Sequence, residues 1–336
     1  MSSVTLASGL TLSYAHQGRA LDPAVLLLPG PTDSWRSYQP VLDRLPPDTW
    51  AISVSQRGHG ESDKPDTGYG VEDFAADAVL LLDALGIERA VLAAHSGSCL
   101  VARRVALDEP DRVAGLFLEA SPATLRDDPQ LFGLVESVLS ELEDPISPDF
   151  ARGFLTQTSS VGLRPDLIDL LIEELVKVPT HVWRETFAGL LEYDDLSELG
   201  RIEAPTLLVW GDADDLVPRE MQDHLARSIP DVDLLVYHGV GHTPRWEDPM
   251  RFTGALAAFA RQVAHAQVRA TRRSACARRR VLQLPNGPKS SAQRGATRVR
   301  CDGVVQVGSD THQAIDVPAR ADHSRREPTT VVVVAA

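Results

Sequence analysis

Ser96 lies in a segment whose residue types and spacing suit a reactive hydroxyl. Residues 94–98 read AHSGS, directly after a predicted buried strand and directly before a predicted helix. A serine on such a tight strand-to-helix turn exposes its hydroxyl, provided that the residues two positions to either side are small. The usual pattern is G-x-S-x-G, and here Ala94 and Ser98 replace both glycines but remain small. The N–H of Gly97, helped by the helix N-terminus, could then stabilise an oxyanion formed by attack on a carbonyl.

An acidic segment after a later predicted strand offers a carboxylate. Residues 210–218 read WGDADDLVP and contain Asp212, Asp214 and Asp215. A serine triad needs one buried carboxylate that fixes the tautomer of its histidine and stabilises the charged ring. Periodicity does not choose among the three aspartates.

His242 is a candidate general base. It lies in residues 239–244 (GVGHTP), a loop after the last predicted strand, where glycines let the ring turn toward a neighbour. The pKa of a histidine is near the pH at which most enzymes operate. Serine, aspartate and histidine in this chain order, each after a strand, match the order that one fold of serine enzymes imposes. The order favours a triad of Ser96, one of the aspartates and His242 over three unrelated polar loops.

These loops need a scaffold that brings several strand ends to one edge. Short apolar runs alternate with amphipathic stretches, which predicts an α/β fold with a mostly parallel central sheet and helices on both faces. We predict strands at residues 24–28, 50–54, 90–94, 113–119, 206–210 and 233–237. We predict helices at residues 71–85, 100–107, 130–142, 165–178, 220–228 and 249–264.

Two segments depart from this alternation. Residues 121–200 are rich in Leu, Glu and Asp and contain no convincing strand, so we expect a helical cap inserted between two core strands. The core would then consist of residues 1–120 and 201–265. Residues 266–336 are rich in Arg and contain no Phe, Trp or Tyr. Such a segment buries little apolar area to offset its ordering entropy, so we predict a basic, disordered and dispensable tail.

The composition limits the expected partners. The chain has 336 residues, a formal net charge of -14 and a pI near 5.1, which argues against nucleic acid or an anionic membrane as partner. Its 3 Cys are too few for a disulfide framework, and no metal-ligand spacing or phosphate-binding motif occurs. Neither a secretory signal nor an apolar run of about 20 residues is present. We expect a cytoplasmic protein that acts on a small molecule without cofactor or metal, and the oligomeric state stays open.

The chain resembles the α/β-hydrolase superfamily, in particular the capped branch that includes carboxylesterases, lactonases, cofactor-free haloperoxidases and carbon–carbon bond hydrolases. The matching segments are residues 26–30 (LLLPG), 57–65 (RGHGESDKP) and 241–242 (GH), within a resemblance over residues 10–262. The family's G-x-x-D pattern falls on Asp214, so the resemblance selects Asp214 over the other two aspartates. It also implies that residues 121–200 are the family's cap, which usually shapes the substrate pocket.

The segment after the first predicted parallel strand departs from the family pattern. Relatives carry His-Gly-x, and the N–H of x is the second donor of the oxyanion hole; residues 29–31 here read PGP, and Pro31 has no N–H. Loss of one donor costs about 10²–10³ in rate. Thr32, through its hydroxyl or its N–H, is the candidate substitute after a small loop shift. We expect His59, in the RGHG loop, to have a structural role.

Three functions are compatible with these residues. The leading hypothesis is hydrolysis of a small or medium carboxylic ester or lactone through an acyl-enzyme on Ser96. A serine cannot form the alkyl-ester intermediate of related epoxide hydrolases and dehalogenases, so those activities are disfavoured. The second hypothesis is carbon–carbon bond hydrolysis or perhydrolysis by the same triad, which Pro31 makes more attractive. The third is a ligand-binding pseudoenzyme with a weakened oxyanion hole, against which the intact triad argues.

Overall fold

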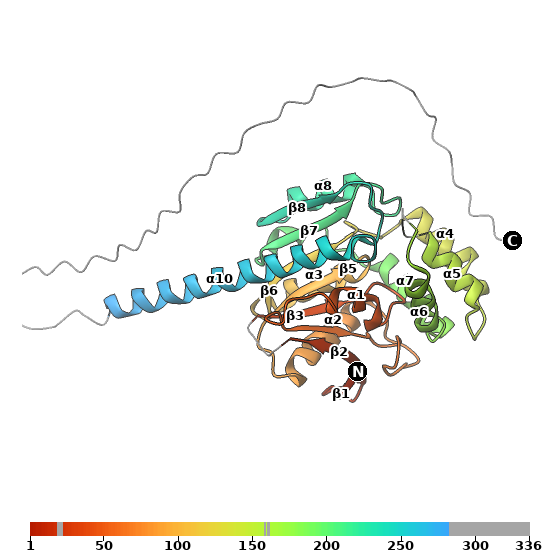
Figure 1. Cartoon of the computed structure of the whole chain (residues 1–336), viewed down its shortest axis with the longest axis horizontal. Helices are drawn as coiled ribbons and strands as arrows, with labels where there is room; N and C mark the ends of the chain where they lie inside the picture. The colour runs from red at the N-terminus through yellow and green to blue at the C-terminus, as the bar shows by residue number, and fades with distance from the viewer. Residues whose placement is uncertain (19–22, 158, 160–161, 282–336) are drawn as a thin grey trace, which may run out of the picture. The chain divides into compact units, whose positions relative to one another are not determined.

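An eight-stranded sheet runs through the structure, in the order β1-β2-β4-β3-β5-β6-β7-β8 (Figure 1). The computed structural model describes residues 1–18, 23–157, 159 and 162–281. The strands are β1 Ser2–Thr5, β2 Thr11–Gln17, β3 Ala24–Leu28, β4 Ala51–Val54, β5 Ala90–His95, β6 Val113–Glu119, β7 Thr206–Gly211 and β8 Val232–Tyr237. β2 is antiparallel to β1 and β4, and the strands from β4 to β8 are parallel, which confirms the predicted fold class.

The six predicted strands all occur, each with ends within one residue of the prediction. Strands β1 and β2 are not among the predicted strands. β1 is the edge strand and is mostly exposed, and β2, next to it, has only two buried residues, Leu12 and Ser13. An edge strand with polar side chains lacks the continuous apolar run by which a buried parallel strand is identified.

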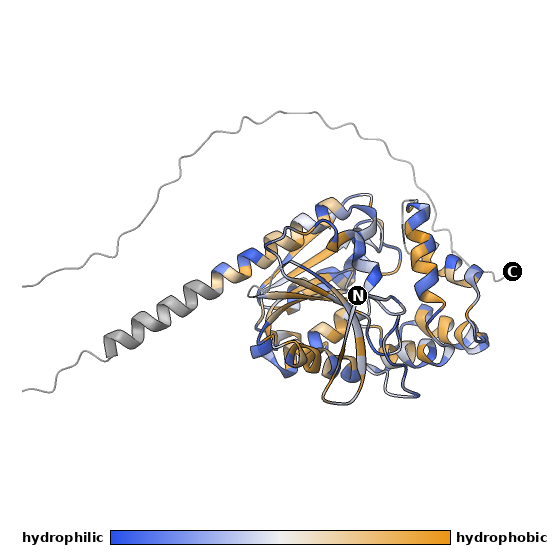
Figure 2. Ribbon diagram, turned by 60° about the horizontal axis from the view of Figure 1, so that its bottom comes forward, coloured by the Kyte–Doolittle hydropathy of each residue, from blue (hydrophilic) through white to orange (hydrophobic). Residues whose placement is uncertain are grey.

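Alternate side chains of each central strand pack on opposite faces of the sheet. In β3, Leu26 and Leu28 belong to one buried cluster, and Val25 and Leu27 belong to another. Helices α2 (Val71–Ala84), α3 (Ser98–Asp108) and α8 (Arg219–Ser228) contribute to the first cluster, and α1 (Gln39–Leu42) and α10 (Pro249–Val281) contribute to the second. The apolar colour of the strands between these two helical layers is visible in Figure 2.

Among the described residues between β6 and β7 are four α-helices, namely α4 (Pro129–Ser137), α5 (Pro148–Thr156), α6 (Pro165–Leu175) and α7 (Thr180–Glu192). They lie together at one side of the sheet (Figure 1). The predicted helices 130–142 and 165–178 correspond to α4 and α6, while α5 and α7 are additional helices of the same segment. In the described residues between β6 and β7 the chain forms no strand.

Arg103 of α3 holds both ends of this inserted segment. Its guanidinium pairs with Asp195, just after α7, at 2.9 and 2.7 Å. It also donates to the carbonyl oxygens of Pro122 and Ala123, just after β6, at 2.9 and 3.0 Å. The side chains of Arg103 and Asp195 are both 0% exposed. Both ends of the inserted segment are therefore bound to the same buried guanidinium, that of Arg103.

Helix α10 extends further than the sequence analysis predicts. It begins at Pro249 and continues to Val281, whereas the predicted helix ends at residue 264. Residues 266–281, the first part of the segment for which we predict disorder, belong to this helix, and their Ala and Arg residues favour helix formation. Residues 282–336 lie outside the described residues. Within the described part of the chain, no helix combines the length and apolarity needed to cross a bilayer.

Candidate active site

Ser96 forms the turn between β5 and α3. Its φ of 53° lies in the left-handed region, which a non-glycine residue adopts only when the surroundings enforce it. The Ser96 N–H donates to the carbonyl oxygen of Glu119 in β6 at 2.9 Å, and the Ser96 carbonyl accepts the N–H of Cys99 at 2.9 Å. A Cβ at Gly97 would come within 2.9 Å of both Leu190 and Pro31. A side chain at residue 97 would therefore displace Leu190 or Pro31, and glycine avoids both contacts.

The structure brings Ser96, His242 and Asp214 together. His242 Nε2 lies 2.9 Å from Ser96 Oγ, and His242 Nδ1 lies 2.9 Å from Asp214 Oδ2. With Nδ1 protonated, the ring donates to the carboxylate and leaves Nε2 free to accept the serine proton. The three residues follow β5, β7 and β8, whose carboxyl ends lie at the same edge of the sheet.

The three aspartates after β7 have different surroundings. Asp214 is buried, and its Oδ1 accepts the N–H groups of Leu216 and Val217 at 2.9 and 3.0 Å. Asp212 instead contacts His238 Nδ1 at 2.7 Å, and this hydrogen bond lowers the pKa of the Asp212 carboxyl. Asp215 is exposed. Asp214 is therefore the aspartate that reaches His242.

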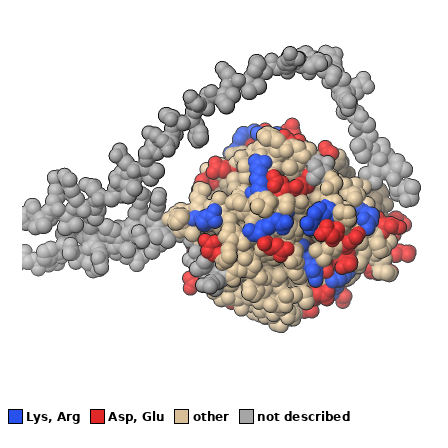
Figure 3. All heavy atoms as spheres, in the orientation of Figure 1, with Lys and Arg blue, Asp and Glu red and all other residues tan. Residues whose placement is uncertain are grey.

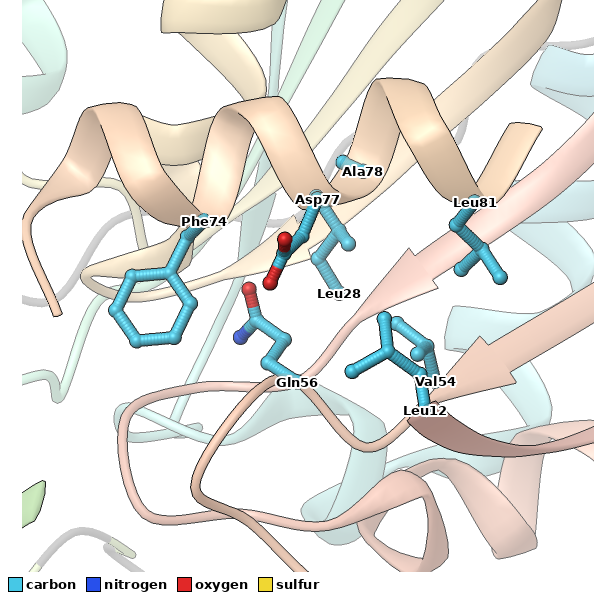
Figure 4. Close-up of a pocket in the computed structure, with 8 residues that line it drawn as sticks. All are labelled: Leu12, Leu28, Val54, Gln56, Phe74, Asp77, Ala78 and Leu81. Carbon is cyan, nitrogen blue, oxygen red and sulfur yellow. The ribbon is translucent and has the colours of Figure 1, made fainter. Parts of the chain in front are cut away.

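Ser98 stands where the usual pattern has glycine, and its hydroxyl has specific hydrogen-bond partners. Its hydroxyl donates to the carbonyl oxygen of Pro29 at 2.6 Å and accepts from Gln56 Nε2 at 3.0 Å. Gln56 Nε2 also lies 3.0 Å from the same Pro29 oxygen. These bonds tie the start of α3 to the loop after β3. On its other side Gln56 lines a small cavity opposite Asp77, which contains none of the triad residues (Figure 4).

The loop after β3 lies against the Ser96 turn. The Pro31 ring contacts Gly97, and Pro31 offers no N–H at the position where relatives place a donor. The Thr32 N–H donates to His59 Nε2 at 3.0 Å, so it is already occupied. The Thr32 hydroxyl is buried and has no hydrogen-bond partner among the described residues. Gly97, at the N-cap of α3, remains the backbone donor next to Ser96.

A buried charged cluster lies behind His242 and is missed by the sequence analysis. Arg245 donates from its backbone N–H to Glu119 Oε1 at 2.8 Å and from its guanidinium to Asp33 Oδ2 at 2.8 Å. Burial raises the pKa of Glu119 to about 7 and that of Asp33 to about 6, although the Arg245 charge opposes both shifts. The one signal in the sequence is a charged residue at the end of the apolar strand β6. Across the described ranges, no three His, Cys, Asp or Glu side chains gather to hold a metal ion.

His95, directly before the nucleophile turn, is a second site residue that the sequence analysis does not identify. Its Nε2 lies 3.1 Å from the carbonyl oxygen of His242, and the two rings are 4.9 Å apart. A Cβ at Gly30 would come within 2.5 Å of His95 Nδ1. Burial, together with Arg245 and His242, holds the pKa of His95 well below its usual value. A neutral His95 thus supports the backbone of the His242 loop.

Comparison with known proteins identifies the family. Residues 23–249 match the family model described as alpha/beta hydrolase fold. The chain belongs to the α/β-hydrolase family. The resemblance inferred from the motifs is thereby confirmed, and the matched segment of this α/β hydrolase includes all three residues of the Ser96, Asp214 and His242 arrangement.

Relatives of this α/β hydrolase have several activities. The chain is 28% identical over 258 residues to a non-heme chloroperoxidase of Streptomyces lividans, and the match covers 72% of this chain and 93% of the relative. A thermophilic esterase from Thermogutta terrifontis, solved with malate bound, is 26% identical with a TM-score of 0.70, over 78% of this chain and 98% of the other. Est816, described as an N-acyl homoserine lactone degrading enzyme, is 26% identical with a TM-score of 0.65, over 77% of this chain and 100% of the other.

Proposed function

We propose that this α/β hydrolase cleaves small or medium carboxylic esters or lactones through an acyl-enzyme on Ser96. The observation that carries the proposal is the continuous series of contacts from Ser96 Oγ to His242 and on to buried Asp214, with both distances 2.9 Å. A hydroxyl on a strained turn beside a correctly oriented imidazole is suited to attack a carbonyl carbon. Esterase and lactone-degrading relatives support the choice of substrate class.

The reaction would proceed in two stages. His242 Nε2 removes the Ser96 proton as Oγ attacks the carbonyl carbon, and Asp214 stabilises the resulting imidazolium. The Gly97 N–H donates to the oxyanion of the tetrahedral intermediate. The imidazolium then protonates the leaving alcohol, which departs as the acyl-enzyme forms. In the second stage His242 Nε2 removes a proton from water as its oxygen attacks the acyl carbon. The bond from that carbon to Ser96 Oγ then breaks, Oγ takes the proton back from the imidazolium, and the acid is released.

Residues 121–200 would act as the cap of this site, with residues 1–120 and 201–265 as the core. Leu190 of α7 reaches the Ser96 turn, since a Cβ at Gly97 would lie 2.9 Å from it. Ser159 Oγ lies 2.6 Å from Thr243 Oγ1, next to His242. Because the inserted segment contacts both sides of the triad, its side chains are placed to select the substrate.

Perhydrolysis or carbon–carbon bond hydrolysis with the same triad is the second candidate. One observation favours it: the loop after β3 presents the Pro31 ring, with no N–H, beside Gly97, so the oxyanion hole differs from the usual pair of donors. The chloroperoxidase relative is consistent with such chemistry. Product analysis separates these reactions from ester hydrolysis. Acetate with hydrogen peroxide tests perhydrolysis, and a broad panel in which only simple esters react would rule out this second candidate.

The proposal is tested by fluorophosphonate labelling and p-nitrophenyl acetate and butyrate hydrolysis, on the wild type and on Ser96→Ala. We expect labelling and turnover in the wild type and loss of both in the variant, since the nucleophile contributes most of the rate. Turnover that persists in Ser96→Ala would refute the Ser96 mechanism. A folded wild type that neither reacts nor hydrolyses any ester would favour the ligand-binding alternative.

A further inference from the structure

Residues 30–33 form a tight turn at the edge of the active site. The Asp33 N–H donates to the Gly30 carbonyl oxygen at 3.0 Å, which closes the turn, and Pro31 and Thr32 are its central residues. Thr32 has a φ of 74°. A closed turn with proline second and a positive φ third is a type II turn, in which the third position normally belongs to glycine. A β-branched threonine there is strained and needs an external partner to stay in place.

His59 is that partner. The Thr32 N–H donates to His59 Nε2 at 3.0 Å, and His59 Nδ1 lies 2.7 Å from the carbonyl oxygen of Arg57. Since a carbonyl only accepts, Nδ1 carries the proton and Nε2 is the acceptor. The ring is 1% exposed and packs against Phe74 with ring centres 6.3 Å apart. The acceptor is thus fixed in both tautomer and position.

The turn that His59 holds is in contact with the nucleophile turn. The Pro31 ring lies against Gly97, the proposed oxyanion donor, and the Pro29 carbonyl is tied to Ser98 and Gln56 at the other end of the loop. The loop is therefore anchored at two points, and the Thr32–His59 hydrogen bond is the anchor directly after Pro31, the residue whose ring lies against Gly97. A change in the Pro31–Thr32 peptide would shift the surface that faces the carbonyl oxygen of a substrate.

We propose that His59 is a positioning residue for the oxyanion side of the active site, which it controls by accepting the Thr32 N–H and so fixing the Pro31–Thr32 turn. The role rests on the proposed function of Ser96. It also assigns the Thr32 N–H to His59 and removes it from the set of oxyanion donors. The RGHG segment thus contributes to rate, beyond its role in shaping its own loop.

Two substitutions at residue 59 separate this role from simple packing. In His59→Gln the side-chain amide oxygen lies near the former Nε2 position and can accept the Thr32 N–H. In His59→Asn the amide can reach the Arg57 carbonyl but is too short to reach Thr32. His16 is exposed on strand β2, and His16→Asn serves as a control for loss of a histidine. The readouts are amide hydrogen exchange of Thr32 by NMR, which needs no activity, and the second-order rate of Ser96 labelling by a fluorophosphonate.

In His59→Asn we expect the Thr32 amide to exchange at least about tenfold faster while the Ser96 amide keeps its protection. We expect labelling to slow by about 10–100-fold, since displacements near 1 Å at a reacting centre cost rate on this scale. His59→Gln should restore most of both values. Unchanged Thr32 exchange in His59→Asn would overturn the anchor. Faster exchange with unchanged labelling would overturn the positioning role, and a wild type with a protected Thr32 amide but no labelling would refute the function of Ser96 instead.

Discussion

Asp212 and Asp214 lie two residues apart yet have separate roles, because the loop after β7 turns between them. Asp212 accepts from Gly239 and contacts exposed His238, which stabilises the neighbouring loop. Asp214 turns inward, where two backbone N–H groups hold one carboxylate oxygen and His242 takes the other. A carboxylate fixed in this way can orient an imidazole without moving during the reaction.

Asp214→Asn should lower kcat by about 10⁴, since the amide favours the wrong histidine tautomer while it preserves the geometry. Asp212→Asn is the matched control and should keep kcat close to the wild-type value. Ester hydrolysis by both variants, with their unfolding midpoints, checks the prediction. Equal loss of kcat in the two variants would contradict the assignment of Asp214.

At the scale of secondary structure, the elements that carry the site follow directly from the sequence. Strands β3, β5 and β7 are mostly apolar and buried, and β8 keeps an apolar run after Asp233. Each strand is followed by a loop with small or polar residues, so their ends are predictable. The contacts of the buried cluster cannot be predicted in this way, because Arg245 meets Glu119 and Asp33 only through the tertiary fold. No local pattern distinguishes a charged residue with such partners from a solvated one. The choice of Asp214 among three aspartates likewise needed the family pattern before it had a geometric basis.

The insertion offers a stability test at this scale. Arg103→Met leaves Asp195 buried without its charged partner and the Pro122 and Ala123 carbonyls without donors. The free energy of unfolding should fall by about 3–5 kcal/mol. As a control, Asp169→Asn breaks an ion pair in which the Arg152 side chain is 52% and the Asp169 side chain 64% exposed. This substitution should lower the free energy of unfolding by less than about 1 kcal/mol. Urea unfolding of both variants measures the difference, and equal losses would show that Arg103 is not a critical anchor.

For the molecule as a whole, many basic side chains are paired with acidic ones, and the excess of acidic residues gives the net charge of -14. Lys, Arg, Asp and Glu side chains are mixed over the face seen in Figure 3. Lys177 pairs with Glu61 and Glu174, which joins the inserted segment to the loop after β4. Surface pairs of this kind contribute little each, so the response of the whole fold to pH depends more on its buried groups.

Buried histidines should make the fold sensitive to acid. Burial lowers the pKa of His59 from 6.5 to about 4, so the unfolded chain takes up a proton between these values that the folded protein does not. The free energy of unfolding should therefore fall as the pH drops from about 6.5 to about 4, by about 3 kcal/mol for this residue. Burial raises the pKa of Glu119 and Asp33, which acts in the opposite direction.

A comparison with His59→Gln isolates the histidine, since the variant keeps the other groups. Urea unfolding at pH 7 and pH 4.5 should show a smaller pH effect in the variant than in the wild type. The same pH effect in both proteins would mean that folding does not lower the pKa of His59, so that it is protonated in the folded protein at pH 4.5.

The clamp at Arg103 also has a consequence for how this molecule can diversify. A segment whose two ends meet at one side chain leaves the sheet and returns to it at nearly the same point, so its length and sequence can change without altering strand order. Insertions at such closely spaced ends add little loop-closure entropy. On the proposed function, the helical segment that selects the substrate can therefore change while the sheet that carries the triad stays the same, with Arg103 as the fixed point between them.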